Sequence, residues 1–396
     1  MAELLSVDEA LEAVLATTGR LRAVTVPLEL AAGYVLAEPA TARVDLPPFP
    51  SSAMDGFAVR AADTPGRLSV VARVAAGRPA DRAIVSGEAT GIATGGVLPE
   101  GADAVVPIER VEVDGDEVEV RDAVSLGANV RPRGGDVQAG EAVVDAGLRL
   151  GPAQIGALAA AGVDLVTCSE RPRVAVLTTG TELRRLGESL GPGEIYESNG
   201  PMLRALLAGV GALVEELDPV EDDEEAHRRA ITQGLAFDVL VTSGGVSVGP
   251  HDLVRRIEAE LGVEEVFWGV SVKPGKPLAF GVAGETLVFG LPGNPVSSLV
   301  CCVLFVLPAL RALQGERAPR PRFESGRLAR SLPPDPRRDE LVRARATPTG
   351  DGVILEPLSG QESHMIVRAA EANALVYVPA GGSELPAGSP VRYLRL

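Results

Sequence analysis

The spacing of apolar residues changes along the chain, and each change predicts a different kind of structure. Residues 6–40 open with a helical pattern in which Ser6 and Glu9 are typical of a capping box, and they continue as extended chain. From 46 to 140 the apolar positions fall in short alternating runs such as "LSVVARVAAG", without a helical period. This stretch is therefore predicted to be a β-rich insertion.

A second helical pattern follows the insertion, with Pro152 in its first turn and Gly162 near its end. The first domain is accordingly expected to be discontinuous. Residues 1–45 and 141–170 would form it, and they would enclose an insertion domain at 46–140.

Residues 171–318 alternate buried strand patterns with helical patterns, as in "RVAVLTTG" followed by "SNGPMLRALLAGVG". This alternation predicts a parallel sheet with helices on both faces, a three-layer α/β domain that binds ligands beyond the carboxyl ends of its strands. The most apolar run, 296–310, is shorter than the roughly 20 residues that span a bilayer, so it is predicted to be a buried helix. Residues 319–396 alternate apolar and polar positions between turns, which indicates a β-barrel-like domain or a sandwich.

Charge and cysteine content narrow the classes of function. A net charge of −17 argues against nucleic acid and against an anionic membrane surface as partners. The first residues carry acids and no basic segment of a signal peptide, so a cytoplasmic location is expected. Cys168, Cys301 and Cys302 lack zinc spacing and are expected to be buried free thiols.

Three glycine-rich loops stand at expected strand ends of the α/β domain, "TTGTEL" (178–183), "TSGGVSVGPHD" (242–252) and "GLPGNPVSS" (290–298). Backbone N–H groups of such loops, together with the N-terminus of the helix that follows, bind anions. Three loops at one sheet edge therefore predict an anion or phosphate site. The standard P-loop and dinucleotide fingerprints are absent from the sequence.

Charged loop residues add candidate chemistry. Lys273 and Lys276 in "KPGKP" are held between prolines and suit an oxyanion or a phosphate, with a solvated hairpin tip as the alternative. Loop carboxylates suit Mg²⁺, and the candidates are Glu182, Asp252, Asp222, Asp223, Asp55 and Asp136. The three histidines, His227, His251 and His364, lack metal-pair spacing and are expected to be ordinary surface or core residues.

Several motifs occur together in a characteristic order: "PPFPSSAMDGFAVRAAD", "GIATGGVLPEGADAVVPIE", "VRPRGGDVQAGE", "VAVLTTGTEL", "GEIYESNGPML", "VTSGGVSVGPHDL", "VKPGKPLAFG" and "GLPGNPVSS". With them the chain resembles, over essentially its whole length, the molybdopterin molybdenumtransferases of the MoeA type, which are related to the C-terminal domain of gephyrin. The resemblance implies a four-domain subunit in a homodimer. It also implies insertion of molybdate into adenylated molybdopterin, with Mg²⁺-dependent release of AMP, and a molybdopterin adenylyltransferase as a possible donor of the substrate.

The resemblance further implies roles for individual residues. The pterin-phosphate loop would be Ser243, Gly244, Gly245 and Ser247, and the same pocket would include Thr179, Gly180, Asn199, Pro292, Gly293, Asn294, Ser297 and Ser298. Lys273 and Lys276 would hold molybdate or phosphate oxygens. Glu182, Asp252 and one of Asp222 and Asp223 would act near the metal and the adenylate phosphate. Arg343 and Ser363 are candidates for a molybdate pocket, and the other subunit would contribute Asp55, Thr94 and Asp136.

The sequence departs from the family at two places, and two other functions compete. Thr181 stands where an acid is common, which removes one possible metal ligand, and "GQESHMI" has Glu362 and His364 where the family usually has smaller neutral residues. The first alternative is a non-catalytic scaffold that presents a peptide groove, as in gephyrin. The second is the adenylyltransferase that precedes this step, which would need neither the β insertion nor the C-terminal domain.

Overall fold

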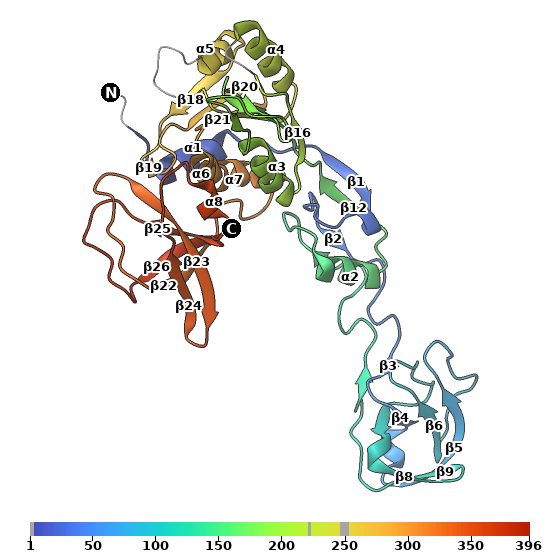
Figure 1. Cartoon of the computed structure of the whole chain (residues 1–396). Helices are drawn as coiled ribbons and strands as arrows, with labels where there is room; N and C mark the ends of the chain where they lie inside the picture. The colour runs from blue at the N-terminus through green and yellow to red at the C-terminus, as the bar shows by residue number, and fades with distance from the viewer. Residues whose placement is uncertain (1–3, 221–222, 246–252) are drawn as a thin grey trace. The chain divides into compact units, whose positions relative to one another are not determined.

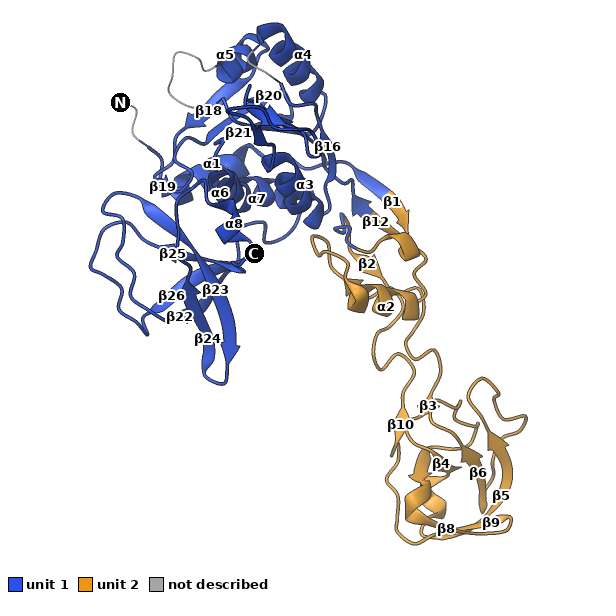
Figure 2. Ribbon diagram, viewed as in Figure 1, with its two compact units in different colours: residues 1–24, 33–37, 168–396 blue, residues 25–32, 38–167 orange. Residues whose placement is uncertain are grey.

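A computed structural model describes residues 4–220, 223–245 and 253–396 of the chain. The chain divides into two compact units, which Figure 2 distinguishes by colour. Unit 1 comprises residues 1–24, 33–37 and 168–396, and unit 2 comprises residues 25–32 and 38–167. Two strands run from one unit into the other along the chain, β1 (Ala23–Pro27) and β12 (Leu165–Ser169).

A six-stranded sheet forms the centre of unit 1, with the strand order β16-β13-β17-β21-β20-β18 (Figure 1). Its strands are β13 (Arg173–Thr178), β16 (Leu213–Glu216), β17 (Val239–Ser243), β18 (Glu264–Trp268), β20 (Ala279–Ala283) and β21 (Thr286–Leu291). The first four strands in this order are parallel, as predicted, but β20 runs antiparallel to both of its neighbours, β21 and β18. The expectation of a wholly parallel sheet was wrong here because only Gly284 and Glu285 join β20 to β21, a loop too short for a crossover.

Helices cover both faces of this sheet. They are α1 (Val7–Thr17), α3 (Asn199–Gly209), α4 (Glu224–Gly234), α5 (Leu253–Glu260), α6 (Pro295–Cys301), the π-helical turn η4 (Cys302–Val306) and α7 (Leu307–Leu313). Alternate residues of β13 belong to two different cores, because Val174 and Val176 pack with α1, α3 and the α6–α7 run, while Ala175 and Leu177 pack with α4 and α5. The domain is therefore a three-layer α/β structure, as the sequence predicted.

The N-terminal helix α1 belongs to the core of unit 1. Its apolar face, which includes Leu11 and Val14, packs in the same core as η4 and α7. Ser6 caps its first turn, since its side-chain oxygen accepts a hydrogen bond from the Glu9 N–H while the Glu9 carboxylate accepts from the Ser6 N–H. The helix α1 therefore packs in unit 1, while residues 141–167 belong to unit 2. The predicted discontinuous domain of residues 1–45 and 141–170 stays a prediction.

The helical run Pro295–Leu313 is the one stretch of the described chain that is long and apolar enough to cross a membrane, and 89% of its most apolar window is buried inside the structure. It is therefore a core helix, as predicted. Cys301 and Cys302 lie on it as buried free thiols, and burial raises the pKa of both thiols. Cys168 is also free, and burial raises the pKa of its thiol to about 11.

The C-terminal region of unit 1 is a closed five-stranded barrel, which settles the choice between barrel and sandwich. Its strands are β22 (Phe323–Leu328), β23 (Asp339–Thr349), β24 (Gly352–Pro357), β25 (Ala374–Val378) and β26 (Pro390–Arg395). They pair in the order β23-β24-β22-β26-β25, and β25 closes the barrel by pairing with β23. The short strand β19 (Val272–Lys273) adds to β23 from the α/β domain, and α8 (Ile366–Ala369) precedes β25.

Unit 2 is mostly β structure, as predicted. A six-stranded sheet has the order β7-β4-β6-β5-β9-β8, from β4 (Gly56–Val59), β5 (Gly66–Val74), β6 (Glu88–Ile92), β7 (Ala104–Pro107), β8 (Val111–Asp114) and β9 (Glu117–Val120). Two-stranded sheets pair β2 (Ala40–Thr41) with β11 (Ala142–Val144) and β3 (Ser51–Ser52) with β10 (Val130–Arg131). The helix α2 (Pro152–Ala160) begins at the predicted proline. Single helical turns are η1 (Leu28–Leu30), η2 (Ala61–Asp63) and η3 (Ile108–Arg110).

Candidate functional site

The three glycine-rich loops meet at the carboxyl edge of the central sheet. The strands β13, β17 and β21 run parallel and in register, so that Thr178 lies beside Ser243 and Ser243 lies beside Leu291. Main-chain bonds continue the pairing into the loops, because the Thr179 N–H donates to the Ser243 carbonyl at 3.0 Å and the Gly244 N–H donates to the Leu291 carbonyl at 3.1 Å. The sheet therefore brings together backbone that is far apart in the sequence.

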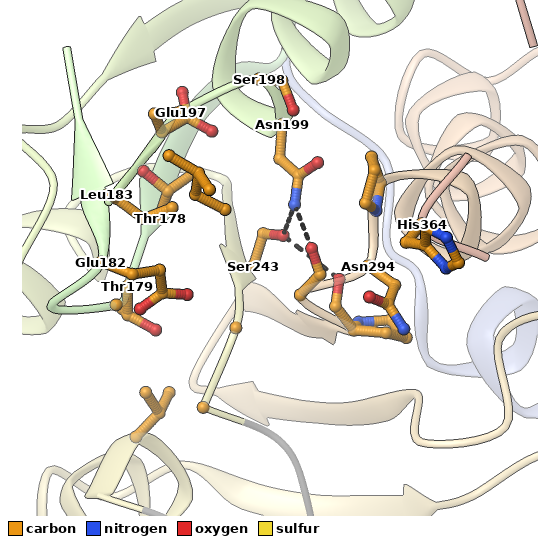
Figure 3. Close-up of a pocket in the computed structure, with 18 of the residues that line it drawn as sticks. Thr178, Thr179, Glu182, Leu183, Glu197, Ser198, Asn199, Ser243, Asn294 and His364 are labelled. Carbon is orange, nitrogen blue, oxygen red and sulfur yellow. Dashed lines mark hydrogen bonds between the residues drawn. The ribbon is translucent and has the colours of Figure 1, made fainter. Parts of the chain in front are cut away.

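A cavity of about 710 Å³ lies at this edge (Figure 3). Many of the residues predicted for the site line it: Thr179, Gly180, Glu182, Asn199, Ser243, Gly244, Gly245, Pro292, Gly293 and Asn294. Further described residues line it as well, among them Leu183, Ile195, Tyr196, Glu197, His227, Leu253, Val254, Pro277, His364 and Ile366. Leu183 and Ile195 belong to the short paired strands β14 (Leu183–Arg184) and β15 (Ile195–Tyr196). In size the cavity suits a ligand as large as a nucleotide.

Glycine is required where the loops touch. Gly244 has a φ of +100°, and a Cβ on it would lie 2.5 Å from the Thr179 carbonyl oxygen. Gly245 has a φ of +65°, and a Cβ there would lie 2.5 Å from a methyl group of Val254. Any side chain at these two positions would push the loops apart, so the tight turn depends on both glycines.

Asn199 ties the loops together at the start of α3. Its Nδ2 donates to the Ser243 hydroxyl oxygen at 2.9 Å and to the Gly293 carbonyl at 2.8 Å, as the dashed lines in Figure 3 show. Because a carbonyl can only accept, the orientation of the amide is fixed. The Asn199 Oδ1 is then left buried, without a hydrogen-bond partner among the described residues. The hydroxyls of Ser243 and Ser298 complete this network with the Pro292 carbonyl.

Glu197 is a buried acid on the wall of the cavity, with 8% of its surface exposed. Burial raises the pKa of its carboxyl group, and the nearby Glu216 carboxylate acts in the same direction. The Gly200 N–H donates to it at 2.9 Å and opposes this rise. No sequence pattern marked this residue, although "YESN" places the acid two positions before the helix α3.

The two lysines of "KPGKP" do not line the cavity with their side chains. The Lys273 Nζ lies 3.1 Å from a Glu340 carboxylate oxygen and 3.7 Å from one of Asp335, so carboxylates already neutralise it. Lys276 is exposed and makes no ion pair with any other described residue. It directly precedes Pro277, which does line the cavity.

The Arg343 side chain is buried and hydrogen-bonded within the protein. It is 1% exposed, and its guanidinium donates to the carbonyls of Gly360, Glu362 and Met365 at 2.7, 3.1 and 2.6 Å. A longer contact of 3.4 Å joins its Nε to the Gln361 Oε1. Arg343 thus holds residues 358–366, which we call the clamp loop. The place of Arg343 in a molybdate pocket, which the resemblance implied, stays a prediction.

The clamp loop docks on the start of α6 beside the cavity. The Val296 N–H donates to the Ser363 carbonyl at 3.0 Å, and the Asn294 Nδ2 donates to the Ser363 hydroxyl at 2.9 Å. His364 and Ile366, which follow, line the cavity. Ser363 is therefore close to the site, but it contributes through the loop and is not itself a lining residue.

The remaining predicted residues lie in several places. Asp223 caps α4, with its Oδ2 accepting from the Ala226 N–H at 2.8 Å, and neither it nor the buried Ser297 and Ser298 is among the described lining residues. Asp222, Ser247 and Asp252 lie outside the described residues. Asp55, Thr94 and Asp136 belong to unit 2.

Asp55 and Thr94 form one local arrangement in unit 2. The Thr94 N–H and hydroxyl donate to the Asp55 Oδ1 at 2.6 and 2.9 Å. These bonds hold the pKa of the Asp55 carboxyl below its usual range. Both residues are exposed or partly exposed, so the carboxylate is ionised, fixed in orientation and open to solvent.

His227 and His364 are lining residues that the sequence analysis assigned to ordinary surface or core. His227 is 1% exposed and lies in the first turn of α4, where its Nδ1 is 2.9 Å from the Asp223 carbonyl. No sequence signal marked it, because a single histidine on an amphipathic helix has no partner spacing. The described lining contains neither lysine nor arginine, so these two histidines are its only side chains able to carry positive charge.

Among the described residues, no group of three or more His, Cys, Asp or Glu side chains lies close enough together to hold a metal ion. Of the three predicted ligands, Glu182 lines the cavity, with its carboxylate folded over Gly180. An oxygen donor in this position is of the type that Mg²⁺ prefers.

Comparison with known proteins covers nearly the whole chain. The family model for the MoeA N-terminal region (domain I and II) matches residues 5–162, that for a probable molybdopterin binding domain matches 175–312, and that for the MoeA C-terminal region (domain IV) matches 325–396. The molybdopterin molybdenumtransferase of Staphylococcus aureus strain Mu50 is 32% identical over 97% of this chain and 94% of its own length. That of Staphylococcus epidermidis strain RP62A is 31% identical over 98% and 94%.

Solved structures agree with these matches. A crystal structure of the molybdopterin biosynthesis MoeA protein from Pyrococcus horikoshii OT3 superposes with a TM-score of 0.86 at 28% identity, covering 100% of both chains. A second structure of the Pyrococcus protein gives a TM-score of 0.82 at 31% identity, covering 99% of both chains. The sequence match and the superposition both extend through the α/β domain, the β-rich unit and the barrel. This chain belongs to the MoeA family of molybdopterin molybdenumtransferases.

Proposed function

We propose that the enzyme inserts molybdate into adenylated molybdopterin and releases AMP in a Mg²⁺-dependent reaction, as a cytoplasmic homodimer. The observation that carries the proposal is the cavity at the three loops, most of whose lining residues lie in the region matched by the molybdopterin-binding family model. A molybdopterin adenylyltransferase is the donor we expect for the substrate. The chain also has the β-rich unit and the barrel, which a protein with adenylyltransferase activity alone would not need.

The cavity can bind an anionic substrate through its backbone. Gly180, Gly244 and Gly245 lie in its turns, and without side chains their N–H groups can approach phosphate oxygens closely. Lys276, which directly precedes the lining residue Pro277, would bind a phosphate or molybdate oxygen. Lys273 would do so only after leaving the carboxylates of Asp335 and Glu340. The asymmetry predicts that Lys276 contributes more to binding than Lys273.

A metal ion would complete the charge balance. Glu182 would hold Mg²⁺ together with Asp252 and one of Asp222 and Asp223, and the bound ion would neutralise charge on the phosphate oxygens. For AMP release, a water oxygen bonds to the adenylate phosphorus while the bond from that phosphorus to the bridging oxygen breaks. The pterin phosphate leaves with that oxygen, and the carboxylates of the cavity orient the water and accept its proton.

Molybdate and the dimer partner are further parts of the proposal. Molybdate is a tetrahedral dianion, and we place it near Lys276 and the clamp loop, which forms the barrel side of the cavity. Asp55 and Thr94 would reach the cavity of the other subunit. The Asp55 carboxylate is exposed and fixed in orientation by Thr94, which supports such a role. Its Oδ2 makes no hydrogen bond among the described contacts, since both bonds from Thr94 go to Oδ1.

The test is a coupled assay under anaerobic conditions. Purified protein is mixed with adenylated molybdopterin, Mg²⁺ and molybdate, and AMP is measured together with the activity of a cofactor-dependent apoenzyme. AMP release that requires both Mg²⁺ and molybdate, with active cofactor as the product, supports the proposal. If the protein binds substrate but releases no AMP, the scaffold function is favoured instead.

A further inference from the structure

His364 lies on the clamp loop at the wall of the cavity, and the main chain on both sides of it is held in place. The Ser363 carbonyl accepts a hydrogen bond from the Val296 N–H at 3.0 Å. The Met365 carbonyl accepts one from the Arg343 guanidinium at 2.6 Å. The loop therefore presents the His364 side chain to the cavity from a backbone that is fixed at both neighbouring residues.

The imidazole ring of His364 is open to a ligand. The residue is exposed, and its ring makes no hydrogen bond or ion pair with any described residue. Glu182 and Thr179 lie across the cavity from it in Figure 3. An imidazole carries at least one N–H in either neutral tautomer and in its charged form. The ring can therefore donate a hydrogen bond in every protonation state.

Several other donors of the cavity already bind acceptors of the protein itself. The Asn199 amide nitrogen donates to two such acceptors, the Asn294 amide nitrogen to the clamp loop, and the Tyr196 hydroxyl to a main-chain carbonyl. The described lining contains neither lysine nor arginine. The oxygens of an ionised oxyanion only accept hydrogen bonds. An oxyanion in the cavity therefore meets an uncommitted side-chain N–H at His364.

We propose that a ring N–H of His364 donates a hydrogen bond to a tetrahedral oxyanion bound in the cavity, either molybdate or a phosphate group of the substrate. This rests on the proposed function, which supplies both oxyanions. A hydrogen bond to a charged acceptor is stronger than one between neutral groups. Because the clamp loop already fixes the main chain, binding at this position restricts only one side chain, which keeps its cost in entropy small.

Three substitutions of His364 distinguish a hydrogen-bond donor from a side chain that only fills space. His364→Leu keeps much of the volume and removes every donor, whereas His364→Gln returns an amide N–H near the position of Nε2. His364→Glu replaces the donor with a carboxylate, which repels an anion. Arg368→Gln is the matched control, because Arg368 is also exposed, lies four positions further along the chain and is not among the described lining residues.

The experiment is isothermal titration calorimetry on the full chain at pH 8 with Mg²⁺ present. The probes are molybdate, AMP and adenosine, which is AMP without its phosphate. We expect His364→Leu to bind molybdate or AMP about three- to tenfold more weakly, and His364→Gln to stay within about twofold of the unmodified protein. His364→Glu should bind the same probe more weakly still, and Arg368→Gln should match the unmodified protein. Adenosine should bind equally in all variants, and the weakened probe identifies the oxyanion.

The inference is overturned if His364→Leu binds both oxyanions as well as the unmodified protein does, which would leave the ring bound to water. Equal losses in His364→Leu and His364→Gln, an equal loss in Arg368→Gln, or weaker binding of adenosine would overturn it too. So would failure of the unmodified protein to bind either oxyanion at millimolar concentration. None of these measurements needs turnover. A chain that binds molybdate or AMP through His364 and yet releases no AMP from the adenylated substrate retains this inference and loses the proposed function.

Discussion

Replacing Arg343 with methionine should detach the clamp loop from the barrel without unfolding the rest of unit 1. Methionine keeps much of the buried volume and removes every guanidinium hydrogen bond. The carbonyls of Gly360, Glu362 and Met365 then lose donors at 2.7, 3.1 and 2.6 Å. All three belong to the loop that carries Ser363 and His364 to the cavity, so the local structure changes before the barrel does.

The expected loss in the free energy of unfolding is the difference between two opposing contributions. Three short bonds from a charged donor contribute roughly 1.5–3 kcal/mol each, and the 3.4 Å contact to Gln361 adds little. Against this stands the cost of burying the guanidinium, several kcal/mol, which is also why burial lowers the pKa of Arg343. The net loss in the free energy of unfolding should therefore be about 2–4 kcal/mol, and it is limited by local opening of the loop.

Hydrogen exchange measured by mass spectrometry tests this reasoning, with Arg345→Met as the matched control. Arg345 lies two positions along the same strand, and its ion pairs with Glu356 and Glu371 are about half exposed, so its loss should cost less than about 1 kcal/mol. In Arg343→Met, peptides covering residues 358–366 and the Val296 amide should exchange faster, with weaker AMP binding. Unchanged exchange in the clamp loop, together with an unchanged unfolding midpoint, would show that the guanidinium does not hold the loop.

Two further predictions concern the barrel and the proposed dimer. Glu324 accepts from the Arg395 guanidinium at 2.9 and 3.1 Å and from the Tyr393 hydroxyl, and these bonds lower the pKa of its carboxyl from the usual 4.5 to about 2. A lowered folded-state pKa means that this contribution to stability is complete above pH 4.5 and disappears as the pH falls towards 2. The difference in melting temperature between the unmodified protein and Glu324→Gln should shrink over that range, and a constant difference would contradict the assignment. For the dimer, mixing Asp55→Asn with Lys276→Ala subunits should restore about one working site per heterodimer, while each variant alone stays inactive as a folded dimer. Heterodimers that form and remain inactive would contradict a shared site.

The main features of the α/β domain could be predicted because they depend on short-range signals. Runs such as "RVAVLTTG" combine apolar residues with a terminal glycine, and this pattern marks both a buried strand and the loop that ends it. Parallel register then brings Thr178, Ser243 and Leu291 to one edge without further information. The antiparallel strand β20 was missed because the two residues Gly284 and Glu285 reverse the chain direction before β21, and a pattern of alternating strands and helices does not reveal so short a turn.

Side-chain roles that depend on distant partners could not be predicted. The resemblance made Arg343 a candidate for a molybdate pocket. The sequence does not reveal the bonds from its guanidinium to main-chain carbonyls of the clamp loop, because it does not show how that loop folds. The ion pairs of Lys273 were equally out of reach, since Asp335 and Glu340 approach this lysine only when β19 joins the barrel.

Charge at the cavity gives the proposed chemistry its main constraint. The chain has a net charge of −17, and the described lining contains the carboxylates of Glu182 and Glu197 but neither lysine nor arginine. A polyanionic substrate would be repelled by such a surface unless other groups compensate. In the proposed function, backbone N–H groups would supply part of the compensation, and Lys276, which directly precedes the lining residue Pro277, would supply one positive charge. Mg²⁺ held by acids such as Glu182 would supply the rest. On this proposal an acidic protein could bind an anionic substrate, and binding would depend on the same ion that the chemistry needs.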